Sequence, residues 1–247
     1  MGCRLCLKNV KLVNSHVISE FLYSRMYDPK HRFFVISSAP EVDDRLFQKG
    51  LREPLLCEDC DNRVLSTYEN YARRVLDGGE MIQTAIDRND LRLRDLDYTR
   101  LRMFYLSLLW RMSVSKHPYF KEVSLGPHEE VLRRMLLEAR PGEPDQYGLL
   151  CVAPVFGGQH LGNWMMPPDW VRMNGRRVYR CLIAGLLYCF FVGKSPLPGR
   201  LMERFIQKNG SWVIRREKIE KIRFLADWCV RIGEAMNERR LRGGARV

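Results

Sequence analysis

Four of the eight cysteines form two closely spaced pairs, Cys3 with Cys6 and Cys57 with Cys60. A Cys-x-x-Cys pair in a tight turn can direct two thiolates at one tetrahedral ion, and a second pair completes a four-sulfur shell. The spacing therefore predicts that these four residues hold structural Zn2+. Two other interpretations stay open: the cysteines are ordinary core residues, or one pair is redox-active. The second is disfavoured because neither pair lies in a strand-then-helix pattern of the thioredoxin kind.

Four further polar residues lie near these pairs, namely His16, Asp61, Asn62 and Glu69. Histidine titrates near neutral pH and can deprotonate water, and carboxylate or amide oxygens can hold Mg2+ or Mn2+. Blander interpretations are also open. His16 bonds to backbone near the zinc, or is a zinc ligand itself. Asp61 or Asn62 caps the next helix, and Glu69 is an ordinary surface residue on one face of that helix.

Short elements of different types must position these residues. Within residues 1–80, strand formers indicate the strands, apolar residues at three-to-four spacing indicate the helices, and turn residues separate these elements. The expected elements are a strand at 11–13 leading into His16, a helix at 19–27 capped by Ser19, paired strands at 32–37 and 45–48, and an amphipathic helix at 61–76. Along the sequence the order is a Cys-x-x-Cys turn (a knuckle), a strand, a hairpin, a second knuckle and a helix.

This order, with Cys3-Arg4-Leu5-Cys6, Ser15-His16-Val17-Ile18 and Leu55-Leu56-Cys57-Glu58-Asp59-Cys60-Asp61-Asn62, resembles the ββα-metal, treble-clef HNH nuclease superfamily. The resemblance covers about the first seventy residues. It implies that the four cysteines hold a structural zinc and that His16 is the general base. It also implies that Asp61, with Asn62 beside it, lies where the family holds a catalytic Mg2+ or Mn2+, and it suggests a role in host–phage defence.

Two positions depart from the HNH pattern. Ser15 stands where the family has an acidic residue or histidine, and Ser19 stands where it has proline. A serine hydroxyl is a poor sole partner for magnesium, which prefers carboxylates and water. Glu20, Glu58 or Glu69 would have to supply the missing charge. The site is therefore either a working variant or a decayed nuclease that is kept for binding.

The composition favours a globular protein with polyanionic partners. The net charge is +12, the isoelectric point is about 9.5, and 46% of the residues are hydrophobic. The start of the sequence has no charged-then-apolar export signal, and the longest apolar run, 181–192, is too short to span a membrane. We expect a cytoplasmic protein that binds nucleic acid, with a protein partner as a further possibility.

The remaining two thirds of the sequence predict a mixture of helices and strands. An apolar helix over 91–112 carries arginines that form either a nucleic-acid face or a solvated rim. Asn174-Gly175 predicts a type I′ hairpin turn, and 182–192 is either a strand or a buried helix. The other expected elements are helices at 129–140 and from 218 onward, strands at 147–156 and 212–214, and a mobile basic tail.

The sequence thus predicts an α+β protein with an N-terminal zinc-bound treble-clef module over 1–80. A larger helical domain with a small antiparallel sheet follows over 81–238, and a flexible tail over 239–247. The expected function is a metal-dependent HNH-like nuclease acting on DNA or RNA, with His16, Asp61, Asn62 and Glu69 as site residues. The alternative is a non-catalytic zinc-containing adaptor that binds nucleic acid or protein.

Overall fold

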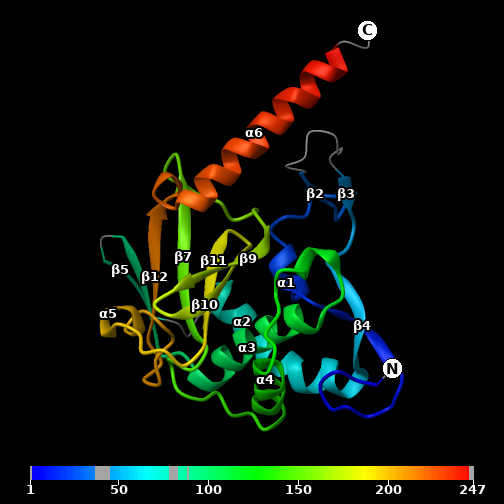
Figure 1. The fold of residues 1–247 in the computed structure, drawn as a ribbon, viewed down its shortest axis with the longest axis vertical. Coiled ribbons are helices and arrows are strands. Elements are labelled where there is room, and N and C mark those ends of the chain that lie inside the picture. The colour runs from blue at the N-terminus through cyan, green and yellow to red at the C-terminus, as the bar shows by residue number, and fades with distance from the viewer. Residues whose placement is uncertain (1, 37–44, 78–82, 88, 245–247) are drawn as a thin grey trace.

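The computed structural model describes residues 2–36, 45–77, 83–87 and 89–244, which form a mixed α+β fold (Figure 1). Within these ranges the α-helices are α1 (Glu20–Tyr23), α2 (Ser66–Leu76), α3 (Tyr98–Val114), α4 (His128–Leu137), α5 (Gly199–Met202) and α6 (Arg223–Gly244). Three other short helices are η1 (Cys60–Leu65), a π-helix, and the 3-10 turns η2 (Pro118–Phe120) and η3 (Ile219–Lys221).

The strands lie in three sheets. Two small antiparallel pairs occur near the N-terminus, β1 (Leu12–His16) with β4 (Arg52–Cys57) and β2 (Phe33–Val35) with β3 (Arg45–Phe47). The large sheet contains β5 (Gln83–Asp87), β6 (Asp90–Arg94), β7 (Gly148–Phe156), β8 (Gln159–His160), β9 (Met166–Met173), β10 (Arg176–Ile183), β11 (Leu186–Val192) and β12 (Trp212–Lys218). The strand predicted at 11–13 and the paired strands predicted at 32–37 and 45–48 are confirmed as β1, β2 and β3.

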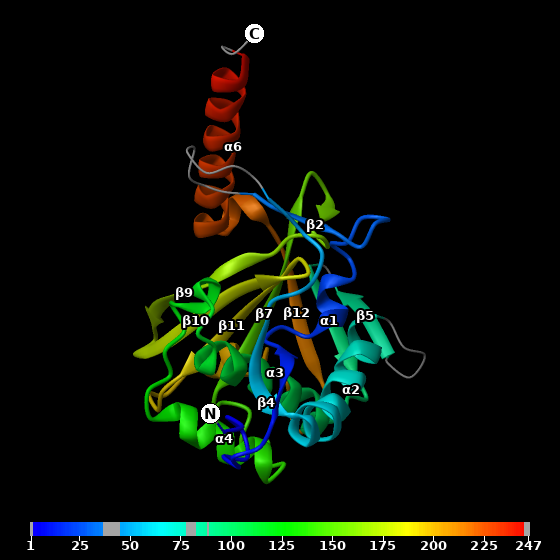
Figure 2. The same ribbon diagram turned by 90° about the vertical axis from the view of Figure 1, so that its right-hand side faces the viewer.

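The large sheet has the order β5-β6-β12-β7-β11-β10-β9, with β8 paired to β7 (Figure 2). Every pairing in it is antiparallel except that of β12 with β7. The sheet is therefore larger than the small one that the sequence predicted. The difference arises because β6 and β12 come from segments that were assigned to a helix and to a three-residue strand.

Both faces of this sheet are buried, which explains the apolar run at 186–192. Along β11, Tyr188 and Phe190 belong to one hydrophobic cluster, whereas Leu187, Cys189 and Phe191 belong to another on the opposite side. Successive strand residues point to opposite faces, so a strand covered on both sides reads as continuously apolar. The open choice between strand and helix is thus decided in favour of a strand.

Helix α3 fills the first face of the sheet. Tyr105 lies 5.2 Å from the ring of Tyr188 and 5.5 Å from that of Trp212, centroid to centroid. The predicted helix over 91–112 is wrong at its start, because Leu91 and Leu93 alternate with arginines in β6, which pairs with β12. The helix begins after Asp97, whose side chain accepts a hydrogen bond from the amide of Arg100 and caps it.

The N-terminal module and the sheet domain share one hydrophobic core. Leu22 of α1, Leu65 of η1 and Ala72 of α2 belong to the same cluster as Leu108 of α3 and Cys151 of β7. Packing between α2 and α3 is extensive, and α3 also packs on α4. The residues that surround His16 are therefore held by elements from both halves of the chain.

Two smaller predictions need correction and one is confirmed. Residues 239–244 continue α6 rather than forming a flexible tail, and α6 projects away from the sheet in both views (Figures 1 and 2). Helix α1 covers only Glu20–Tyr23, and Ser19 makes no capping hydrogen bond there. The β9–β10 hairpin turns at Asn174 and Gly175, both with positive φ, as the type I′ turn requires.

Candidate zinc site and histidine–carboxylate cluster

The structure brings Cys3, Cys6, Cys57 and Cys60 together, with all four sulfurs within 4.8 Å of one another. The Sγ atoms of Cys6 and Cys57 are 3.8 Å apart. Zinc–sulfur bonds of about 2.3 Å in a tetrahedron place sulfurs about 3.8 Å apart, so the spacing suits a metal such as zinc. Three of the four residues are buried and Cys6 is half-buried. This cluster can hold a structural metal.

Local backbone geometry prepares these sulfurs for a metal. Leu7 closes the first knuckle with φ of +61°, and its amide bonds to the carbonyl of Cys3. Burial raises the pKa of the Cys3 thiol, but hydrogen bonds from Cys6, Cys57 and Leu5 outweigh it and lower that pKa to about 7. Backbone donors thus stabilise the thiolate of Cys3, the form that binds zinc, whereas burial raises the pKa values of Cys6 and Cys60.

The second knuckle leads directly into a π-helix. Cys57 ends β4, Cys60 begins η1, and the amide of Ser66 bonds to the carbonyl of Asp61 five residues earlier. Short π-helical segments are rare and occur often at functional sites. Asp61 therefore lies within η1 rather than at its N-cap, which is Asp59.

His16 and Glu20 form a close pair at the edge of this module. Nε2 of His16 lies 2.7 Å from Oε2 of Glu20, and the two side chains are 23% and 35% exposed. Tyr27 donates a 2.7 Å hydrogen bond to Oε1 of Glu20, and Nε2 of His31 lies 3.5 Å from the same oxygen. Arg52, opposite His16 on β4, completes the group 3.5 Å from Oε2.

The charges of this group favour a neutral His16. Burial and then Arg52 lower the pKa of His16 below its ordinary value, and Glu20 opposes them without cancelling their effect. Burial raises the pKa of Glu20, but Tyr27, His16 and Arg52 lower it overall. Near neutral pH the pair is therefore a neutral imidazole beside a carboxylate. This arrangement can accept a proton and stabilise the resulting imidazolium.

The side chain of Arg111, on α3, lies inside the N-terminal module and is only 1% exposed. Its NH1 lies 2.7 Å from Oε1 of Glu69 and donates a 3.0 Å hydrogen bond to the carbonyl of His16. Its NH2 donates to the hydroxyl of Ser19 at 3.1 Å, and that hydroxyl donates to Glu69 at 2.7 Å. The buried guanidinium thus joins β1, α1 and α2 at the predicted site.

Asp61 and Ser15 face each other within the same region. Burial raises the pKa of Asp61, while Arg111 and a hydrogen bond with Ser15 lower it in part. Ser15 is fully buried. The HNH pattern would place a metal ligand at position 15, but this residue is a buried serine whose hydroxyl donates a hydrogen bond to the carbonyl of Val13 at 3.4 Å.

The four predicted site residues are thus only partly brought together. His16, Asp61 and Glu69 interact electrostatically, whereas Asn62 is exposed and offers its backbone carbonyl to the hydroxyl of Ser66. Among the described residues, the four cysteines are the one group of three or more His, Cys, Asp or Glu side chains with ligand atoms close enough to share a metal.

A catalytic divalent ion therefore does not fit the residues as they are arranged. Magnesium sites in proteins use carboxylates whose charge the metal neutralises, together with water and substrate oxygens. Here the Arg111 guanidinium already neutralises Glu69 and acts on Asp61.

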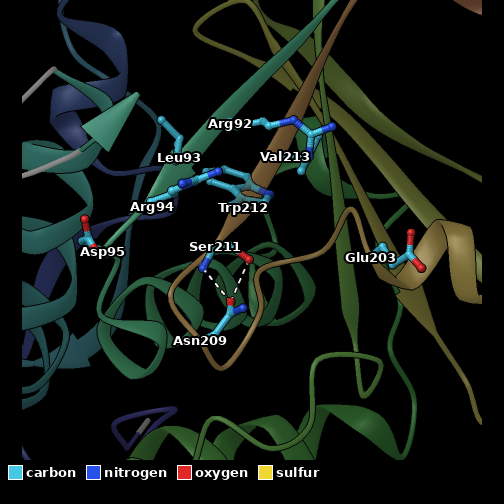
Figure 3. A pocket seen from close by; sticks show the side chains of 9 residues that line it. All are labelled: Arg92, Leu93, Arg94, Asp95, Glu203, Asn209, Ser211, Trp212 and Val213. Carbon is cyan, nitrogen blue, oxygen red and sulfur yellow. Dashed lines mark hydrogen bonds between the residues drawn. The ribbon is translucent and has the colours of Figure 1, made fainter. Parts of the chain in front are cut away.

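A separate groove lies on the outer side of β6 and β12 (Figure 3). It consists of adjoining cavities of about 380 and 320 Å³ that share Arg92, Glu203 and Val213. Figure 3 shows Asn209 accepting hydrogen bonds from the amide and hydroxyl of Ser211 at its rim. Arginine and acidic side chains both line it, and none of the predicted site residues does.

Sequence reasoning missed most partners of His16. Glu20 was expected only as one of three sources of charge, although its i, i+4 spacing from His16 was a usable signal. Arg52, Tyr27 and His31 approach Glu20 through strand pairing and a turn that the sequence does not reveal. Arg111 was expected on a nucleic-acid face or on a solvated rim, but it is buried.

Comparison with protein-family models, curated proteins and solved structures finds no match. Within the ranges that the structure describes, no helix has the length and apolarity to cross a membrane. The site must therefore be interpreted from its own geometry.

Proposed function

We propose that this protein is an HNH-like nuclease that cleaves phosphodiester bonds, with His16 as the general base. The observation that carries the proposal is the pair formed by His16 and Glu20 beside Arg52, at the end of the β1–β4 ladder opposite the four-cysteine cluster. A partly buried imidazole that is neutral near pH 7 and held by a carboxylate suits proton abstraction. The net charge of +12 supports a polyanionic substrate.

Each residue of the pair has a distinct task in this proposal. Glu20 accepts the Nε2 proton of His16, which leaves Nδ1 as the basic nitrogen and stabilises the imidazolium that forms. Arg52 supplies positive charge for the phosphate. Zinc at the cysteines would hold β4 and η1 in place, and thus Arg52 and Asp61, without taking part in the reaction.

The test is cleavage of plasmid DNA and of a structured RNA, with and without Mg2+ or Mn2+. We expect His16→Ala to lower the rate by about 10²–10⁴-fold, the usual contribution of a general base. Circular dichroism and zinc content must match those of the wild type. If the variant cleaves as fast as the wild type, the proposal is refuted.

A second candidate function is a non-catalytic zinc-containing adaptor. It is favoured because the Arg111 guanidinium pairs with Glu69 and acts on Asp61, the carboxylates that would otherwise hold a catalytic metal. Nucleic-acid binding that falls with salt and is unchanged in His16→Ala, without cleavage by either protein, would support the adaptor.

A further inference from the structure

The carboxylate of Glu20 contacts four polar side chains. Its Oε2 faces His16 at 2.7 Å and Arg52 at 3.5 Å, while its Oε1 faces Tyr27 at 2.7 Å and His31 at 3.5 Å. Two histidines therefore lie on either side of one carboxylate. His31 is 68% exposed, so its ring is accessible to a substrate.

The position of His31 is built by its neighbours. Its ring stacks on Tyr27 with centroids 3.8 Å apart, and its backbone φ is +58°. Asp28 closes the turn, because its carboxylate accepts hydrogen bonds from the amides of Lys30 and Arg32 and its carbonyl accepts one from the amide of His31. A left-handed non-glycine residue is strained and persists only where its surroundings enforce it.

The carboxylates next to His16 do not supply a metal. Arg111 pairs with Glu69 at 2.7 Å and its charge also acts on Asp61, so a divalent ion would have to displace the ion pair of a buried guanidinium. Cleavage without a metal-bound hydroxide needs another nucleophile. RNA contains one in the 2′-hydroxyl beside each phosphodiester, and DNA does not.

We propose that His16, Glu20 and His31 form a metal-independent ribonuclease site, an inference that rests on the nuclease function proposed above. The His16–Glu20 pair takes the proton from the 2′-hydroxyl, and the 2′-oxygen forms a bond to phosphorus. The bond from phosphorus to the 5′-oxygen breaks, and protonated His31 gives its proton to that oxygen. The products are a 2′,3′-cyclic phosphate and a 5′-hydroxyl.

Charge around the site fits this division of roles. Arg52 faces His16 across the β1–β4 ladder and disfavours the imidazolium, as does burial, while Glu20 and Glu69 favour it. His31 holds its Nε2 3.5 Å from Oε1 of Glu20 while 68% of its side chain is exposed. The geometry thus assigns the proton-accepting role to the partly buried His16 and the proton-donating role to the accessible His31.

The experiment compares three fluorescent substrates in buffer with EDTA: an RNA oligonucleotide, the same sequence in DNA, and the RNA with one 2′-deoxynucleotide at the cleaved position. Zinc content is measured after chelation, so that loss of the structural metal is detected. The variants are His31→Ala and His16→Ala, with His160→Ala as the matched control because His160 is an exposed histidine on β8.

We expect cleavage of the RNA alone, with a 2′,3′-cyclic phosphate product and a loss of about 10²–10⁴-fold in each of His31→Ala and His16→Ala. Cleavage of DNA, or a requirement for added Mg2+ or Mn2+ with 5′-phosphate products, would overturn this inference but leave the nuclease proposal intact. Full activity of His31→Ala would overturn it too. No cleavage of any substrate by the zinc-loaded protein would reject both proposals.

Discussion

Replacing Arg111 by methionine tests whether its guanidinium holds the site together. Methionine keeps an unbranched apolar side chain of similar reach, so the change removes the charge and three contacts rather than the packing. The lost contacts are those to Glu69 at 2.7 Å, to the carbonyl of His16 at 3.0 Å and to the hydroxyl of Ser19 at 3.1 Å.

The size of the effect follows from burial. Removing one partner of a buried ion pair costs about 3–5 kcal/mol, because the other charge is left without compensation. Arg111 is 1% exposed but Glu69 is 26% exposed, so water can solvate the orphaned carboxylate in part. We therefore expect a loss near the lower limit, about 3 kcal/mol of unfolding free energy.

The assay is urea unfolding of the zinc-loaded wild type, Arg111→Met, Glu69→Gln and the double variant. We expect the double variant to be more stable than the sum of the single losses predicts, with a coupling of about 1–3 kcal/mol. Removing Arg111 also frees two carboxylates, so Mn2+ should raise the melting temperature of Arg111→Met more than that of the wild type. A loss below about 1 kcal/mol with no coupling would refute the reasoning, because a buried ion pair cannot be removed at so small a cost.

Two further predictions concern the cysteines and the titration of His16. Cys57→Ser should bind less zinc, by atomic emission, and lose several kcal/mol of stability, because metal binding contributes to folding; full zinc content and normal stability would show that no metal is held there. The pKa of His16 is lower in the folded state than in the unfolded state, so its contribution to stability is present above about pH 6.5. That contribution should be lost as the pH falls through the folded pKa, and acid titration of His16→Gln by urea unfolding should show a shallower loss than the wild type; equal slopes would contradict this.

Local patterns predicted much of the N-terminal module. The Cys-x-x-Cys spacing located the four-sulfur cluster, because a turn of this length can direct two sulfurs at one ion and a second such pair completes its shell. Strand formers located β1, β2 and β3, and the Asn174-Gly175 turn was recognisable because few residues accept its backbone angles. Each of these signals depends on neighbours in the sequence.

Long-range packing explains what the sequence did not reveal. Leu91 and Leu93 fit a helix as well as a strand, and only the pairing of β6 with β12 decides between them. Arg111 reads as a surface residue until α3 is placed under β1. Tyr27 was assigned to the helix at 19–27 and His31 gave no signal, because a turn with a left-handed residue, which the sequence does not reveal, brings them to Glu20.

The place of β12 in the large sheet has a consequence for the order of assembly during synthesis. This strand, at 212–218, lies between β6 and β7, which are both synthesised more than fifty residues earlier. While the ribosome is still adding those residues, β5 and β6 have no strand linking them to the other five, and one edge of β7 stays open. The nascent chain must therefore expose unpaired strand edges for some seconds, at elongation rates of about 5–20 residues per second. Such edges are sites of aggregation and of chaperone binding, so amino-acid changes that weaken β12 should lower the yield of folded protein more than their effect on equilibrium stability alone would suggest.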